Sequence, residues 1–208
     1  MDTNSPHAPA SPEHRPVEYM RADAARNMHR IVEVAARLLG EEPNAGMAEV
    51  ATAAGVSRAT VYRHFPSREV LLSAIRRQAL EHGEAALAEC RLDAGSATDA
   101  LRRLVRAWLE LAERYSFPQL AAQPGINATP EAREHQRRAF AQPLSALIAR
   151  GQAEGEFAAA MTPEWAARVF IVVVLAGARS VAEGSLSRAD APDVVSDTLL
   201  DGLRGPSA

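Results

Sequence analysis

The chain of 208 residues has few of the residues that would point to a disulfide scaffold, a metal site or a basic surface. Its single cysteine, Cys90, excludes an internal disulfide, and no neighbouring residues give it the spacing of a zinc site. Lysine is absent, so all 23 basic residues are arginines, and 26 acidic residues bring the net charge to −3. Any signal for nucleic-acid binding must therefore be local.

Long hydrophobic runs are also missing. The longest uncharged run, VFIVVVLAGA at 169–178, lies between Arg168 and Arg179 and has about half the length of a membrane span. The N-terminus has Pro, His and Ser where a signal peptide would have an apolar run. These features predict a cytoplasmic protein that does not interact with membranes, and a fully buried helix over the apolar run.

Motifs that mark common enzyme classes are absent too. The sequence has no phosphate loop, no HExxH pattern, no nucleophile elbow and no paired arrangement of carboxylates. We therefore expect no catalytic residue, no cofactor and no metal.

Helical periodicity is present through most of the chain, and no segment has the alternation of a strand. Four prolines in the first 17 residues predict a disordered arm over 1–20. Apolar spacing, caps and breakers then predict helices, which are listed in chain order: 21–40, 47–54, 58–65, 67–91, 98–115, 131–154, 163–184 and 188–204. The prediction is an all-α protein in three parts, namely a helix-turn-helix domain at 21–66, a connecting helix at 67–91 and a second helical bundle at 92–208.

The segment GVSRATVYRHFPSREVLL at 55–72 combines a helix-ending glycine, a capping serine and a short basic helix. A helix, a turn with Gly and a second short helix form the plan of a helix-turn-helix. Val61 and Phe65 lie one turn apart and are expected to dock the short helix. The opposite face carries Ala59, Thr60 and Arg63, with Tyr62 at its edge and Arg58 at the leading end; His64 lies near the inner flank. Arginine, threonine and tyrosine are types that bind base edges and phosphates.

These residues also carry a family resemblance. The segment AEVATAAGVSRATVYRHFPSREVLLSAI at 48–75 resembles the helix-turn-helix of TetR/AcrR-type bacterial transcriptional regulators. The resemblance implies base contacts from Arg58, Ala59, Thr60 and Arg63, and phosphate contacts from Tyr62, His64 and Arg68. Gly46 departs from the family pattern, which often has a capping Thr there, so this position offers DNA a backbone N–H at most. Arg68 stands where Lys is usual and keeps its charge.

The second half of the chain contains both tryptophans and several other aromatic residues. By the same resemblance, family members bind small, often apolar molecules inside this bundle, so we expect a cavity within residues 98–184. The candidate ligand-binding residues are Trp108, Tyr115, Phe117, Phe140, Phe170 and Arg179. Aromatic residues at helical spacing are more often part of a core, and this alternative stays open for each of them.

Together these features predict a ligand-responsive regulator, most simply a repressor, that binds a palindromic DNA operator as a homodimer and responds to a small-molecule effector. We expect the last two long helices to form the dimer, because the run at 169–178 is apolar on every side. The alternative is an all-helical bundle that binds small molecules or proteins without binding DNA. Salt-dependent retention on duplex DNA distinguishes the two.

Overall fold

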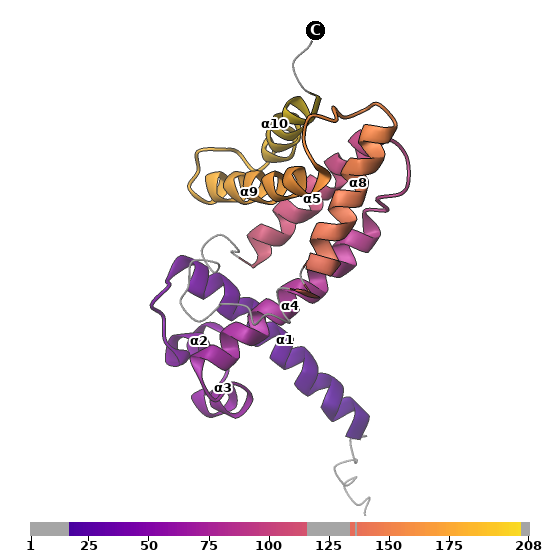
Figure 1. Cartoon of the computed structure of the whole chain (residues 1–208). Coiled ribbons are helices and arrows are strands. Elements are labelled where there is room, and N and C mark those ends of the chain that lie inside the picture. The colour runs from indigo at the N-terminus through magenta and orange to yellow at the C-terminus, as the bar shows by residue number, and fades with distance from the viewer. Residues whose placement is uncertain (1–16, 116–133, 136, 205–208) are drawn as a thin grey trace, which may run out of the picture.

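The computed structural model describes residues 17–115, 134–135 and 137–204, and these are helical without a strand (Figure 1). The N-terminal elements are α1 (Val17–Glu41), α2 (Met47–Ala53), α3 (Arg58–His64) and α4 (Arg68–Glu89). The C-terminal elements are α5 (Ala97–Arg114), the short π-helix η1 (Arg137–Ala141), α8 (Gln142–Ala153), α9 (Pro163–Ala182) and α10 (Ala191–Arg204). The predicted all-α class is confirmed.

The first helix begins at Val17, four residues before the predicted start at residue 21. Residues 17–39 contain neither proline nor glycine, so nothing in the sequence stops the helix from extending back to this point. The predicted disordered arm at 1–20 is therefore wrong for residues 17–20, and its remainder lies outside the described residues.

Serine and threonine caps fix several helix starts. The side chains of Ser57, Ser67, Ser96 and Thr162 each accept the backbone N–H of the residue three positions later, at 3.1, 3.4, 3.0 and 3.3 Å. Each cap satisfies one of the backbone donors that the first turn of a helix leaves unpaired. The caps therefore set where α3, α4, α5 and α9 begin, within one residue of the positions expected from the sequence.

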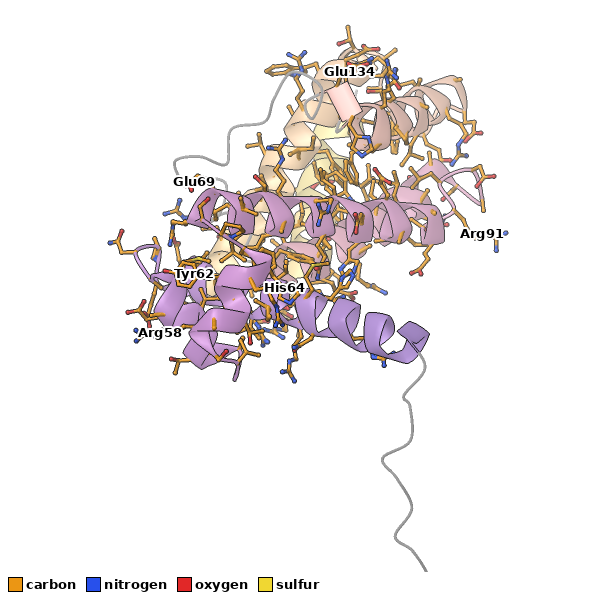
Figure 2. The ribbon with its side chains drawn as sticks, turned by 90° about the horizontal axis from the view of Figure 1, so that it is seen from below. Arg58, Tyr62, His64, Glu69, Arg91 and Glu134 are labelled. Atoms are coloured by element: carbon orange, nitrogen blue, oxygen red, sulfur yellow. The ribbon has the colours of Figure 1, made fainter. Side chains whose placement is uncertain are left out.

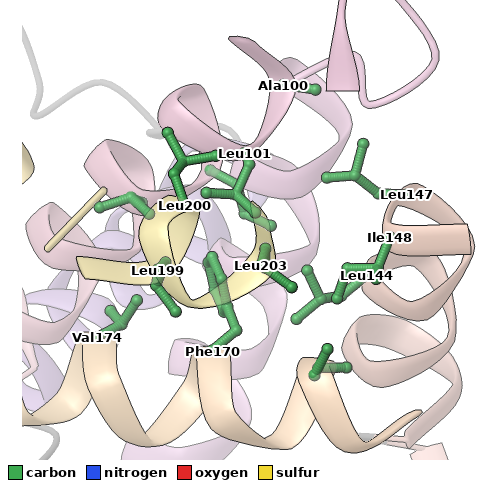
Figure 3. Close-up of a cluster of buried hydrophobic side chains, with 14 of the residues drawn as sticks. Ala100, Leu101, Leu144, Leu147, Ile148, Phe170, Val174, Leu199, Leu200 and Leu203 are labelled. Carbon is green, nitrogen blue, oxygen red and sulfur yellow. The ribbon is translucent and has the colours of Figure 1, made fainter. Parts of the chain in front are cut away.

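Two hydrophobic cores lie along the chain, and α4 belongs to both. Its first half packs into an N-terminal core with α1, α2 and α3, through residues such as Leu71, Leu72 and Ile75. Its second half contributes Leu87, followed by Cys90, to a C-terminal core that α5, α8, α9 and α10 complete (Figure 3). The segment predicted as a separate connecting helix is therefore part of both cores.

Helix α9 is only partly buried in the single chain. It is long and apolar enough to cross a membrane by length and composition alone, yet only 33% of that window is buried. Val172 is 66% exposed and Trp165 is 56% exposed. The expectation of a helix buried on every side is wrong for the isolated chain, because α5, α8 and α10 cover only one side of α9.

Candidate nucleic-acid interface and ligand pocket

The turn between α2 and α3 sets the direction of α3. Gly55 has a φ of +66°, a left-handed conformation that glycine adopts without the steric cost of a side chain. Ser57 then begins α3, and its hydroxyl is also hydrogen-bonded to the Thr60 hydroxyl at 2.8 Å. Val61 and Phe65 are buried in the N-terminal core, as predicted, and hold the helix against α1, α2 and α4. Docking through these two side chains leaves the other face of α3 free.

The free face of α3 carries the residues that the sequence singled out. Arg58, Ala59 and Arg63 are exposed, and Tyr62 is 51% exposed. Figure 2 shows Arg58 and Tyr62 on α3. Thr60 is half-buried, and its hydroxyl is paired with that of Ser57. Among the predicted base-contacting residues, the structure therefore brings two arginines and the Ala59 methyl group to one open surface. Within residues 56–68 no acidic side chain opposes them.

His64 ends α3 and lies at its inner flank, as the helical spacing predicts. It is half-buried, and its ring centroid lies 6.2 Å from that of Phe65. A shallow groove lies beside His64 along the first turns of α4. Glu69 and Val70 also line this groove. The hydrogen bond from Ser67 lowers the pKa of the exposed Glu69 carboxyl, so a negative charge stays close to His64. A phosphate contact from His64 remains a prediction.

Arg68 bridges α4 to the loop that leads into α2. Its guanidinium donates one hydrogen bond to the carbonyl of Pro43 at 2.7 Å and another to the carbonyl of Ala45. The sequence predicted that a phosphate would relieve the conflict between this positive charge and the α4 dipole. In the structure backbone carbonyls accept these hydrogen bonds, so Arg68 holds the N-terminal domain together.

The N-terminus of α2 is closed by a side chain that the sequence analysis missed. The backbone N–H of Gly46 donates to the Glu49 carboxylate at 2.7 Å. The donor expected to be available to DNA is thus already paired. A carboxylate there also makes a phosphate contact at this helix end unfavourable. Glu49 at the third position of a helix is the signal that would have found this cap.

A pocket of about 320 Å³ opens between α4 and three elements of the C-terminal half. Its walls come from α4, α5, η1 and α9, and its lining residues are Ala79, Leu80, Trp108, Leu111, Ala112, Arg137, Phe140, Ala141, Ile171, Val174 and Leu175. It lies largely within the predicted range 98–184, but α4 supplies a wall that the sequence analysis did not expect.

Aromatic packing shapes the back of this pocket. The Trp108 ring meets Phe140 edge-on, with centroids 5.6 Å apart, and meets Phe170 in the same way at 5.5 Å. Phe170 is 1% exposed and stands behind Trp108, as part of the C-terminal core. Trp108 and Phe140 therefore line the pocket, whereas Phe170 supports it.

Two other predicted ligand residues lie elsewhere. Tyr115 is fully buried in the N-terminal core, where its hydroxyl is hydrogen-bonded to His82 Nδ1. It lies there because α5 ends against α1 and α4. Arg179 is exposed and donates to Glu183, the C-cap residue of α9, at 2.7 Å, since i,i+4 positions are neighbours at the end of a helix. Phe117 lies outside the described residues.

The π-helix η1 supplies three of the pocket residues, Arg137, Phe140 and Ala141. Pro143 follows directly and has no backbone N–H, so it cannot continue the α-helical hydrogen bonds toward residue 139. A π-turn at such a point is common at functional sites. The motif QP at 142–143 was the sequence signal for this irregularity.

Comparison with known proteins finds similar sequences and structures. Residues 31–75 match the model of the family described as bacterial regulatory proteins, tetR family. The chain is 29% identical to the HTH-type transcriptional repressor LfrR of Mycolicibacterium smegmatis, over 86% of this chain and 90% of LfrR. It is 25% identical to the HTH-type transcriptional regulator NfxB of Pseudomonas aeruginosa, over 86% of this chain and 95% of NfxB.

Solved structures agree with the sequence matches. The structure of LfrR in complex with proflavine superposes with a TM-score of 0.69 and 27% identity, covering 87% of this chain and 98% of LfrR. PfmR from Thermus thermophilus, a TetR family transcriptional regulator, gives a TM-score of 0.65 and 28% identity, over 86% of this chain and 96% of PfmR. The similarity thus extends beyond the helix-turn-helix to the C-terminal bundle.

Proposed function

From the premise that this chain is a TetR-family transcriptional regulator, we propose that it is a repressor that binds a palindromic operator as a homodimer and is released by a small effector. The observation that carries the proposal is the free face of α3, where Arg58, Tyr62 and Arg63 are exposed together. The repressor LfrR, which matches over most of both chains, supports the direction of regulation. The protein acts in the cytoplasm, where its DNA target lies.

Each side chain on α3 has a role in this proposal. Arg58 and Arg63 are long enough to donate to guanine O6 and N7 in the major groove. The methyl groups of Ala59 and Thr60 contact thymine methyl groups, and the hydroxyl of Tyr62 donates to a phosphate. Sequence preference comes from the base contacts, whereas the phosphate contacts position the helix.

The dimer in this proposal forms through the open side of α9 together with α10. The exposed side of α9 combines the apolar Trp165 and Val172 with Arg168 and Arg179. The exposed side of α10 is acidic and carries Asp193, Asp197 and Asp201. A two-fold axis brings each α9 against the partner's α10, so the apolar groups are buried and the opposite charges meet. Two copies of α3 then reach half-sites about one helical turn of DNA apart.

The position of α4 accounts for how a bound ligand releases the protein from DNA in this proposal. Ala79 and Leu80 of α4 line the pocket, and the first half of the same helix holds α3 in the N-terminal core. A ligand that enters the pocket pushes on α4 and changes the separation of the two α3 helices. If the ligand binds the released form about 100-fold more tightly, it contributes about 2.7 kcal/mol toward release. The proflavine complex of LfrR supports a small, planar effector.

DNA selection with random duplexes tests the proposal. We expect an enriched palindrome and an affinity that falls steeply with salt. The double substitution of Tyr62 and Arg63 by alanine removes both affinity and preference, while Arg91→Ala, at an exposed position just beyond the C-terminal end of α4, leaves them unchanged. Unchanged affinity and preference in the double variant would contradict the proposal and favour a helical bundle that does not bind DNA.

Sedimentation tests the dimer separately. We expect a dimer at micromolar concentration, and Val172→Asp should convert it to a monomer because a carboxylate would be buried in the interface. A wild-type monomer, or a dimer that Val172→Asp leaves intact, contradicts the proposed interface.

A further inference from the structure

Among the described residues that line the pocket, the polar side chains are all hydrogen-bond donors. Among the described lining residues only Trp108 and Arg137 carry polar side chains. The indole N–H of Trp108 and the guanidinium of Arg137 donate, and neither accepts. The other lining side chains are aliphatic or aromatic hydrocarbons. This part of the wall thus has no carboxylate with which to bind a cation.

Trp108 contributes a donor that is unpaired within the protein. Its Nε1 atom is buried and has no hydrogen-bond partner. A buried donor without a partner is unfavourable, because it has lost its hydrogen bond to water without gaining another. Trp108 also lines the pocket, so a bound molecule that displaces the groups covering this atom can supply the missing acceptor.

The segment that carries Arg137 has two arginines and one carboxylate. Arg137 donates to both oxygens of Glu134, at 2.8 and 2.7 Å, and Arg138 donates to one of them at 2.7 Å. Two cations therefore share one carboxylate. These hydrogen bonds lower the pKa of Glu134 to about 2, so the carboxylate stays ionised and committed to the two arginines.

A second carboxylate in this region is engaged as well. Glu84 Oε1 lies 2.7 Å from Nε2 of His135. Glu84 follows Gly83, whose lack of a side chain lets the Phe140 ring pack against α4: a Cβ there would lie 2.8 Å from that ring. Among the described residues near the wall, Glu134 and Glu84 thus each have a basic side chain within 2.8 Å, and Glu84 Oε1 makes no hydrogen bond beyond this ion-pair contact.

We propose that the effector is a planar apolar molecule with a carbonyl or carboxylate acceptor, neutral or negatively charged, which binds the Trp108 N–H and the Arg137 guanidinium. This inference rests on the proposed effector function of the same pocket. It differs from the ligand in the LfrR complex, because proflavine is an aromatic dye that is cationic near neutral pH.

Four bicyclic probes with the same ring test the acceptor and the charge by calorimetry on the full-length protein without DNA. They are naphthalene, 2-acetylnaphthalene, 2-naphthoate and 2-naphthylmethylammonium, with proflavine as a fifth compound. We expect 2-acetylnaphthalene and 2-naphthoate to bind about tenfold more tightly than naphthalene, as one gained hydrogen bond predicts. We expect the ammonium compound and proflavine to bind more weakly than 2-naphthoate.

Two variants locate the contacts. Arg137→Gln should weaken 2-naphthoate more than 2-acetylnaphthalene, while Arg91→Gln, at an exposed position outside the pocket lining, should weaken neither. In ¹H–¹⁵N spectra the Trp108 indole signal should move downfield with the two acceptor probes and not with naphthalene. Trp165→Phe identifies that signal, since the chain has two tryptophans.

Tighter binding of the ammonium compound or proflavine than of 2-naphthoate would overturn the inference, as would equal binding of naphthalene and 2-acetylnaphthalene. Absence of binding by every probe would overturn it too. Failure of the proposed DNA function has a separate readout, because the duplex experiments use no probe. A protein that binds 2-naphthoate without binding DNA would keep this inference and contradict the repressor.

Discussion

The DNA-facing helix and the pocket place their key side chains in opposite environments. On α3, Tyr62 is 51% exposed and Arg58 and Arg63 are open to solvent, whereas Trp108 and Phe140 are packed edge to edge inside the bundle. The first set lies on seven consecutive residues of one helix, and the second is assembled from four elements between residues 79 and 175. Changes on α3 should therefore affect binding without affecting folding, while changes in the interior should affect both.

Tyr115 connects the two regions, because it belongs to α5 in sequence but to the N-terminal core in space. We expect Tyr115→Ala to lower the free energy of unfolding by about 3–5 kcal/mol, since it empties a fully buried aromatic site. Urea denaturation measures this change. Tyr62→Ala removes an equally large but exposed side chain and should leave stability within about 0.5 kcal/mol. Similar effects of the two changes would remove the distinction between interior and surface.

Substitution of Arg63 tests most directly whether the exposed face of α3 contacts DNA bases. Arg63→Ala should weaken operator binding by about 1–3 kcal/mol and relax the preference at one position in each half-site, because a bidentate base contact is lost. Duplex selection and titration measure both effects, and the melting temperature should stay unchanged. A uniform loss over all duplexes would assign Arg63 to the phosphate backbone.

Arg68 belongs neither to the exposed face of α3 nor to the interior, and its contacts in the structure change the result that we expect from its substitution. Arg68→Ala should lower the free energy of unfolding by about 1 kcal/mol, because its hydrogen bonds to the loop before α2 are lost from a partly exposed site. The slope of log affinity against log salt should stay the same. A slope that flattens by about one unit would restore the phosphate contact expected from the sequence.

His82 should give the smallest effect and a measurable pH dependence. Burial, together with the nearby Arg114, lowers the pKa of His82, with His29, Glu33 and Glu81 also close enough to influence it. The unfolded chain then binds a proton at pH values where the folded protein does not. The free energy of unfolding should therefore fall as the pH drops below about 6.5, the ordinary histidine value. Urea titrations at several pH values should show a weaker dependence in His82→Gln, and an unchanged dependence would exclude His82 as its source.

The sequence alone determined the helices and the open face of α3. Helix starts and exposure depend on residues within one or two turns, such as the cap at Ser57, the breaker at Pro66 and the spacing of Val61 and Phe65. The cap, the breaker and the spacing of apolar residues act within one segment of the chain, before any tertiary contact exists. The sequence also contains two local signals that the predictions did not use. Glu49 is the cap of α2, and Pro143 is the cause of the π-turn.

Only the tertiary structure decided which aromatic residues share a pocket and which partners the arginines have. Trp108 and Tyr115 are seven residues apart on one helix, yet one lines the pocket and the other fills the N-terminal core. Arg68 contacts carbonyls more than 20 residues away in the chain. Such contacts depend on how whole helices cross, which no local spacing specifies, because the same apolar pattern packs equally well against more than one neighbour.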